Sequence, residues 1–238
     1  MNVDDVAQTT EYPADKLMSI VAQQTILMQK YHGIERDNGL LQTELVPVDI
    51  HDRHGQARLK DFAWRVTEEI AEATEAMEVH ADIPQHALEE LGDALHFLIE
   101  LDILSGIDFD NDIIRQAMLA HDEAKLECGL DELYRSLAYR GGVGGDQFGM
   151  VPDDGLSSLI RGRAYSAIES LGKAMNCLKQ KPWKQTHLLT DMAKYKKHLV
   201  AANHAFFLLC FTLMDAKTLY DVYCRKKQVN EFRIRSKY

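Results

Sequence analysis

Apolar residues recur every three or four positions through most of the 238-residue chain, which is the spacing of one face of an α-helix. Between residues 58 and 79, for example, Val66, Ile70, Ala73 and Met77 share one face. No segment shows the strict alternation of a half-buried strand. The pattern predicts an all-α helical bundle, with helices over residues 16–31, 58–79, 85–105, 111–137, 157–179, 191–214 and 216–232.

Composition indicates irregular structure in two segments, one at the start of the chain and one near its middle. Residues 1–14 are polar and are expected to be disordered or frayed, and residues 15–238 are expected to form a single domain. The glycine-rich stretch beginning at Gly141 predicts a flexible loop over about 139–156. That loop lacks the Lys and Ser/Thr of a phosphate-binding P-loop, so a linker or lid is favoured over a nucleotide cradle.

The charge pattern has one unusual segment, which runs from Val66 to Ile114 without a Lys or Arg and contains 14 Asp and Glu. It holds two acid pairs with the same spacing, on two predicted helices joined by a short break that ends at Pro84. Side chains three apart on a helix lie on one face, and helices joined by a short link pack antiparallel. The four carboxylates are those of Glu69, Glu72, Glu90 and Asp93.

These acids are predicted to bind a metal ion. Like charges on one face repel, and Glu90 is in line with the apolar Phe97 and Leu101, where burial of a carboxylate requires a partner. Four oxygen ligands suit Mg²⁺, with Mn²⁺ as a substitute, and not zinc. Mg²⁺ there would bind a phosphate ester and activate water. The alternative is a solvated acidic face, the interpretation for Glu68, Glu75, Glu78, Glu89 and Glu100.

The C-terminal segment has the opposite charge. Lys226, Asn230 and Arg233 fall on one helical face, and Tyr238 ends the sequence. An ammonium, an amide and a guanidinium together suit a polyphosphate. The alternative is that these cations only offset the dipole at a helix C-terminus.

Composition as a whole narrows the class of protein. A formal charge of −10 argues against binding nucleic acid or an anionic membrane. The four cysteines, which have no paired short spacing, are typical of reduced cytoplasmic cysteines. We find no signal-peptide pattern, and the longest apolar runs are too short to span a bilayer. A cytoplasmic protein is expected.

Both motifs resemble a known family. The sequence Glu69-x-x-Glu72 … Glu90-x-x-Asp93-x-x-His96 resembles the metal motif of the all-α nucleoside triphosphate pyrophosphatases, the MazG-like superfamily. Lys226-x₃-Asn230-x₂-Arg233-x₄-Tyr238 is similar to the closing motif of its dimeric dUTPase and phage dCTPase–dUTPase branch.

The resemblance implies a Mg²⁺-dependent hydrolysis of a deoxynucleoside triphosphate to the monophosphate and pyrophosphate. It assigns Mg²⁺ binding to the four acids, activation of water to Glu69, phosphate binding to the C-terminal motif beside a homodimer partner, and contact with the base to His96. Gln23 and Gln24 lie where the branch begins a Gln-x-x-Leu-Asn segment that helps to read the base, and Gln24 is the expected base contact. The Asn of that segment is replaced by Leu27 or Met28, and the branch's Trp-rich segment is missing.

The preferred substrate therefore stays open between dUTP, which is favoured, and dCTP or another dNTP. A different class is a helical dimer or scaffold that has lost the chemistry. A faint internal repeat also relates the segment from Glu90 to His96 to the segment from His198 to His204, in which both acids are absent.

Overall fold

The computed structural model describes residues 13–37, 47–78, 84–126, 154–179 and 188–236, and every regular element in these ranges is helical. This confirms the predicted all-α class. The elements are α1 (Pro13–Asp37), α2 (Arg53–Glu78), α3 (Gln85–Ser105), the π-helical turn η2 (Phe109–Ile114) continued as α-helix over 115–126, α5 (Asp154–Cys177), α6 (Met192–Leu213) and α7 (Ala216–Ser236).

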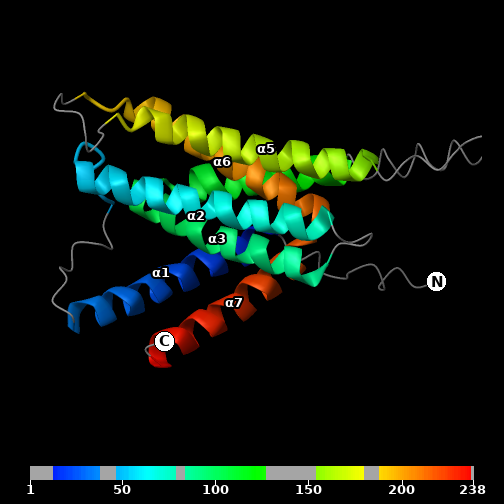
Figure 1. The fold of residues 1–238 in the computed structure, drawn as a ribbon, viewed down its shortest axis with the longest axis horizontal. Helices are drawn as coiled ribbons and strands as arrows, with labels where there is room; N and C mark the ends of the chain where they lie inside the picture. The colour runs from blue at the N-terminus through cyan, green and yellow to red at the C-terminus, as the bar shows by residue number, and fades with distance from the viewer. Residues whose placement is uncertain (1–12, 38–46, 79–83, 127–153, 180–187, 237–238) are drawn as a thin grey trace, which may run out of the picture.

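The helices pack mainly in pairs (Figure 1). α2 and α3 lie side by side and antiparallel, and α5 packs along α6 on one side of them. α1 and α7 lie against α3 on the opposite side of the molecule. The predicted acidic helices are therefore a central pair, with other helices on both sides.

Local side-chain chemistry explains where the helices begin and end. Asp52 accepts hydrogen bonds from the backbone N–H groups of His54 and Gly55, at 2.8 and 3.0 Å, so α2 begins at Arg53 and not at the predicted residue 58. The bounds of α3 match the prediction, with Pro84 before it and Gly106 after it in the left-handed conformation (φ 63°).

Two predicted irregular segments are shorter than expected. α1 begins at Pro13, so the frayed N-terminus does not include residues 13 and 14, and Pro is favoured in a first helical turn. α5 begins at Asp154, inside the loop predicted over 139–156. The rest of that loop, residues 1–12 and the second half of the helix predicted over 111–137 lie outside the described residues.

The core draws on every helix and repeats its spacing in two helix pairs. Five buried positions in α2 have the same intervals as five in α5, and five in α3 have the same intervals as five in α6. The first correspondence is Leu59, Ala63, Val66, Ile70 and Ala73 with Ile160, Ala164, Ala167, Leu171 and Ala174. The second is Leu91, Ala94, Leu95, Leu98 and Ile99 with Leu199, Ala202, Asn203, Phe206 and Phe207. The two pairs thus share a burial register.

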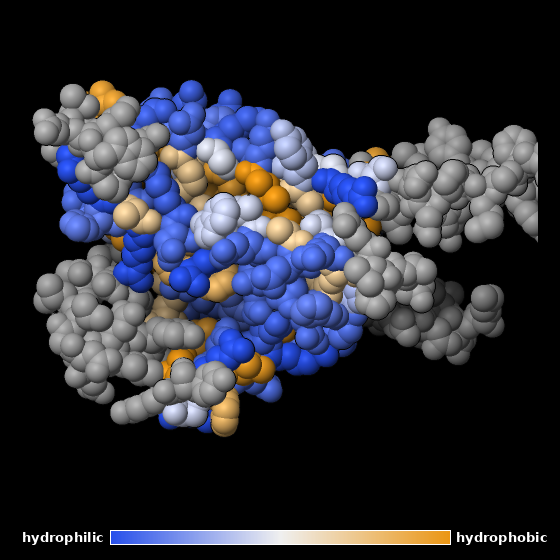
Figure 2. Space-filling view, in the orientation of Figure 1, coloured by the Kyte–Doolittle hydropathy of each residue, from blue (hydrophilic) through white to orange (hydrophobic). Residues whose placement is uncertain are grey.

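The visible surface is mostly hydrophilic, with apolar residues gathered in small areas between helices (Figure 2). Within the described residues, no single helix is long and apolar enough to cross a membrane, although α6 and α7, bent by 103° at their junction, pass that test as a pair.

Candidate metal and phosphate site

Three of the four predicted acids meet between α2 and α3. Glu69, Glu72 and Glu90 each offer one carboxylate oxygen, and these oxygens lie within 4.8 Å of one another. Glu90 is buried, Glu69 is half-buried and Glu72 is exposed. The cluster therefore opens to solvent on the α2 side, where a ligand can enter.

The electrostatics of the cluster are those of acids held too close together. The pKa of Glu69 is raised to about 8, first by burial, then by a hydrogen bond to Glu90 and by the negative charges of Asp93, Glu90 and Glu72. A carboxyl group with this pKa keeps its proton at neutral pH unless a cation takes the proton's place. The cluster can hold either a shared proton or a positive ion.

Asp93, the fourth acid, is paired with a cation from α7. The Nζ atom of Lys226 lies 2.6 Å from Asp93 Oδ2 and 4.0 Å from Glu90 Oε2. Burial raises the pKa of Asp93, and the hydrogen bond from Lys226 opposes that rise. Burial lowers the pKa of Lys226, but the hydrogen bond to Asp93 and the charge of Asp93 have the opposite and larger effect, so the pKa is raised.

The sequence argument that these acids have no counter-charge is therefore wrong. No Lys or Arg lies within the acidic segment itself, but the fold brings Lys226 of the last helix to Glu90 and Asp93. His86, one turn before Glu90, also contacts that carboxylate, with 2.9 Å between Nδ1 and Oε1. The charges are arranged as an open acidic cluster with a cationic edge.

A glycine allows α7 to approach α3 closely. A Cβ atom added at Gly92 would lie 2.6 Å from Cγ1 of Val222, which is too close for real carbon atoms. Gly92 lies between Glu90 and Asp93, and Val222 is one turn before Lys226. The missing side chain thus lets α7 bring Lys226 to the acids.

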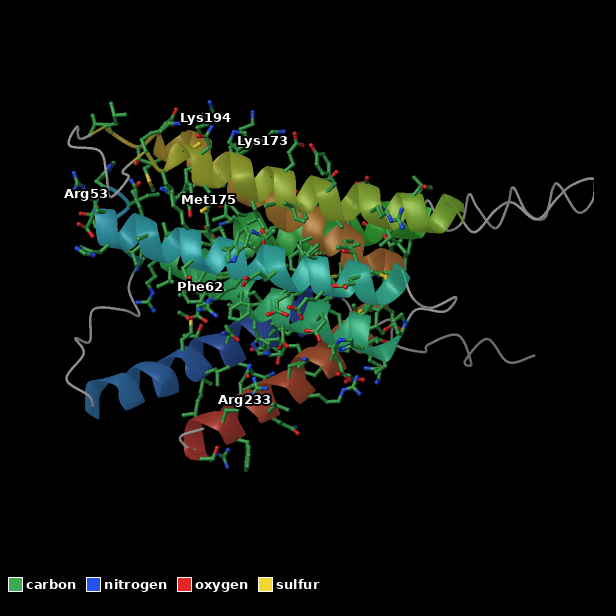
Figure 3. All side chains as sticks on the ribbon, viewed as in Figure 1. Arg53, Phe62, Lys173, Met175, Lys194 and Arg233 are labelled. Atoms are coloured by element: carbon green, nitrogen blue, oxygen red, sulfur yellow. The ribbon has the colours of Figure 1, made fainter. Side chains whose placement is uncertain are left out.

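The predicted phosphate-binding residues line one small cavity beside the acids. Lys226, Asn230 and Arg233 of α7 share a cavity of about 180 Å³ with Asp93. Glu89, Arg225 and Val229 complete its lining. Arg233 lies on the same side of the molecule as α1 (Figure 3). Tyr238 lies outside the described residues. Sequence reasoning missed Arg225, which is exposed and one residue from Lys226.

The two predicted base-binding residues meet in the core and do not line this cavity. His96 Nδ1 lies 2.6 Å from Gln24 Oε1, and both side chains are buried. Tyr223 donates a hydrogen bond to the same oxygen at 3.0 Å and stacks on His96 with 4.2 Å between ring centroids. Tyr223, which sequence reasoning missed, shares α7 with Lys226, but no local signal revealed it because the contact joins α1, α3 and α7.

Burial fixes the protonation of His96. Its pKa is lowered to about 4, first by burial, so the ring is neutral at neutral pH. Because Gln24 Oε1 can only accept, Nδ1 carries the proton and Nε2 is an acceptor. Nε2 is buried and has no hydrogen-bond partner among the described residues. The role of His96 and Gln24 in base recognition stays a prediction.

No family model, curated protein or solved structure matches this chain. Any activity must therefore be inferred from the residues themselves. The strongest argument is the position of the acidic cluster, which adjoins a cavity whose cations suit phosphate oxygens.

Proposed function

We propose that the protein is a Mg²⁺-dependent nucleoside triphosphate pyrophosphohydrolase, with dUTP as its best substrate. One observation carries the proposal: three carboxylate oxygens lie within 4.8 Å of one another, and Lys226, which lines the cavity with Arg233, lies 4.0 Å from Glu90. Acids that can bind a divalent cation next to cations that can bind phosphate form the pairing that triphosphate hydrolysis requires.

The acidic cluster fits Mg²⁺ in donor type and spacing. Two oxygens bound to one Mg²⁺ at about 2.1 Å are at most about 4.2 Å apart, so the three carboxylates need only small rotations. The pKa of Glu69, raised to about 8 first by burial and then by the neighbouring carboxyl groups, supports the same fit, because a bound divalent cation would offset both effects. Glu69, Glu72 and Glu90 would hold the ion, and Asp93 would join them if Lys226 turned to the substrate.

The chain's own residues supply the other requirements of the reaction. Lys226, Asn230 and Arg233 bind the phosphate oxygens and fix the triphosphate. Glu69 accepts a proton from the attacking water, whose oxygen bonds to the α-phosphorus as the bond to the bridging oxygen of the β-phosphate breaks. The products are the monophosphate and pyrophosphate. Bound Mg²⁺ would neutralise the triphosphate charge and acidify the water.

The proposed base preference has a direct alternative. dUTP leads because of the resemblance in both motifs, and dCTP or another dNTP is the alternative because the expected Asn is replaced by Leu27 or Met28. Pockets that pair polar groups with a substrate reject analogues strongly. The missing amide therefore predicts that dCTP is excluded less sharply than in a strict dUTPase.

A homodimer is part of the same proposal. Val229 and Phe232 of α7 are 45% and 67% exposed, on either side of the predicted phosphate-binding Asn230. A second copy that covers these apolar side chains would also enclose the cavity. Light scattering coupled to gel filtration should give twice the mass of the 238-residue chain, and a monomer would contradict this part alone.

The test is a panel of nucleotides incubated with the protein and Mg²⁺, with products separated by chromatography. We expect dUMP and pyrophosphate from dUTP, less product from dCTP, and least from dATP and dGTP. A purine as best substrate would overturn the base assignment. No hydrolysis of any nucleotide would favour a helical scaffold that has lost the chemistry.

A further inference from the structure

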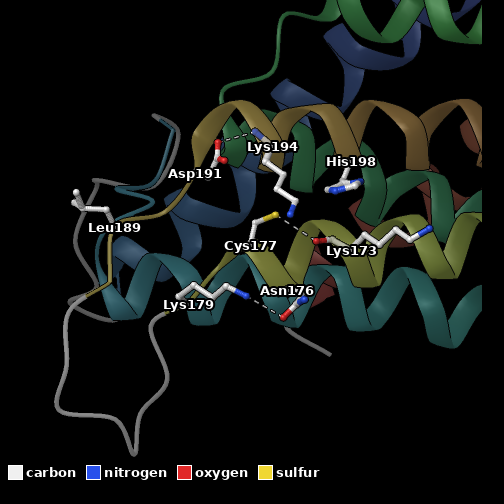
Figure 4. Close-up of a pocket in the computed structure, with 8 residues that line it drawn as sticks. All are labelled: Lys173, Asn176, Cys177, Lys179, Leu189, Asp191, Lys194 and His198. Carbon is white, nitrogen blue, oxygen red and sulfur yellow. Dashed lines mark hydrogen bonds between the residues drawn. The ribbon is translucent and has the colours of Figure 1, made fainter.

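A second cavity, of about 490 Å³, lies between the end of α5 and the start of α6 (Figure 4). Its volume is within the range of about 300–1,000 Å³ that small-molecule sites occupy. The lining residues are Lys173, Asn176, Cys177, Lys179, Leu189, Asp191, Lys194 and His198. None of these residues belongs to the α2–α3 acidic cluster or lines the α7 cavity, and this second cavity has no part in the proposed hydrolysis.

The lining is cationic, although the chain as a whole has a formal charge of −10. It contains three lysines and a histidine against one carboxylate, that of Asp191. Asp191 is engaged as the N-cap of α6, because its Oδ1 accepts the backbone N–H of Lys194 at 3.0 Å. The cavity thus gathers three lysine side chains although the chain as a whole is acidic.

One lysine and the histidine of this lining are available to a ligand. Lys173 is paired with Glu169 at 3.0 Å, and Lys179 donates to Asn176 at 3.2 Å. Within the part of the chain that the structure describes, the Lys194 ammonium and the His198 ring have no hydrogen-bond or ion-pair partner. The Lys194 side chain extends from α6 toward Cys177 on α5, with the His198 ring beside it (Figure 4).

The shared burial register gives a second and independent reason to consider this cavity. In the alignment of buried positions described above, Lys173 of α5 corresponds to Glu72 of α2, and His198 of α6 corresponds to Glu90 of α3. Two of the four acid positions of the first pair therefore carry basic residues in the second, and the other two carry Ser170 and Ala201. The first suits a cation, and the second suits an anion.

We propose that the α5–α6 cavity binds a phosphate-bearing anion, with Lys194 and His198 as its principal contacts. A phosphate group has several oxygens, so one oxygen can accept a hydrogen bond from the ammonium of Lys194 and another from the imidazole of His198. Lys173 and Lys179 lie at the same cavity and add to its positive potential. The ligand is either free pyrophosphate or the phosphate tail of a nucleotide. The proposal does not depend on the activity proposed for the α2–α3 site.

The test is calorimetric titration of the whole protein with sodium pyrophosphate and, separately, with dUTP, both in EDTA so that no divalent metal is present. We expect Lys194→Ala to weaken binding by about tenfold or more, the effect of losing one charge-assisted hydrogen bond. Lys197→Ala is the matched control, since Lys197 is exposed on α6 and does not line the cavity. His198→Ala should weaken binding, and Lys197→Ala should change it little.

The two arms identify the source of the phosphate. Binding of dUTP about tenfold tighter than pyrophosphate, lost in Lys194→Ala, would identify a nucleotide, and equal affinities would identify pyrophosphate. The proposal is overturned if neither ligand binds at about 10 mM, a limit weaker than most specific sites. It is also overturned if Arg233→Ala abolishes binding while Lys194→Ala leaves it unchanged, because the anion then occupies the α7 cavity.

Discussion

The helix pairs α2–α3 and α5–α6 bury side chains at the same intervals but differ in the charge of the residues beside them. Glu69, Glu72, Glu90 and Asp93 of the first pair correspond to Ser170, Lys173, His198 and Ala201 of the second. The apolar positions need only volume and spacing, so they are alike. The flanking positions touch solvent or ligand, and their chemistry is free to differ.

The two helix pairs also differ in where their cations come from. α7 packs on α3 and contributes Lys226 to the acids, whereas α5–α6 has its own lysines. The acidic cluster can exchange the ammonium of Lys226 for a metal ion, and the released Lys226 can then bind a substrate phosphate. We therefore place the proposed hydrolysis at the first pair and the proposed anion binding at the second.

The largest expected effect is the loss of the proposed base in the first pair. Glu69→Gln should lower kcat by about 100-fold or more, the usual contribution of a general base, while nucleotide binding stays measurable. Glu68→Gln is the matched control, because Glu68 is exposed and accepts a hydrogen bond from Trp64 at 2.6 Å outside the cluster. Steady-state kinetics would measure both. Equal rates in the two variants would remove Glu69 from the mechanism.

A smaller loss is expected when the phosphate contact on α7 is removed. Arg233→Ala should lower kcat/KM by about 10- to 150-fold, as for one charge-assisted hydrogen bond of about 1.5–3 kcal/mol. Arg235→Ala serves as control, since Arg235 pairs with Glu231 at 3.2 Å and does not line the cavity. If both variants had the same kinetics as the wild type, the cavity would not be the phosphate site.

The third prediction concerns the contact that joins α7 to the acidic pair. Gly92→Ala forces a methyl group against Val222 and should lower the free energy of unfolding by about 1–3 kcal/mol, with a loss of activity as Lys226 is displaced. Gly172→Ala in α5 meets no atom within 4 Å and should instead stabilise the helix by about 0.5–1 kcal/mol. Urea unfolding tests both changes, and a neutral Gly92→Ala would disprove the close approach.

The smallest effect is expected at the contact between the two pairs. Asp102 of α3 is fully buried, and its Oδ1 accepts a hydrogen bond from Asn203 of α6 at 3.0 Å. Asp102 Oδ2 and Asn203 Oδ1 have no partner among the described residues. Burial, which the hydrogen bond from Asn203 opposes, raises the pKa of Asp102 well above its usual value. Asp102→Asn could satisfy both atoms and should add about 1 kcal/mol of stability near pH 5, about one pH unit above the unfolded pKa.

The pH dependence gives this prediction its sign. Below the unfolded pKa of about 3.9, both states are protonated and the full stability is present. As pH rises toward the raised folded pKa, the unfolded state loses its proton first, so the wild type loses stability. The advantage of Asp102→Asn over the wild type should therefore grow as the pH rises above about 5. If the difference in stability between the two proteins did not change with pH, the pKa of Asp102 would not be raised in the folded protein.

How far the sequence could predict the molecule depends on the range of each interaction. The bounds of α3 were predictable because Pro84 and Gly106 act on the adjacent backbone. The meeting of Glu69, Glu72 and Glu90 was also predictable, from helical spacing and a short link.

Contacts between distant helices were not predictable in this way. The ion pair of Asp93 with Lys226 depends on the angle at which α7 crosses α3 at Gly92. The stacking of Tyr223 on His96 depends on the same crossing, and no periodic pattern in the sequence indicates it. The α5–α6 cavity is formed by the packing of two helices and was not predicted from the sequence.

The central claim is that the α2–α3 acids work through a divalent cation. Its most direct test is to follow dUMP and pyrophosphate formed from dUTP by the metal-stripped protein, before and after Mg²⁺ is added, in the wild type and in Glu72→Gln. We predict no turnover without metal, a return of equal amounts of both products with Mg²⁺ in the wild type, and a higher Mg²⁺ requirement in Glu72→Gln. Full turnover in EDTA, or the same Mg²⁺ requirement in both proteins, would contradict it.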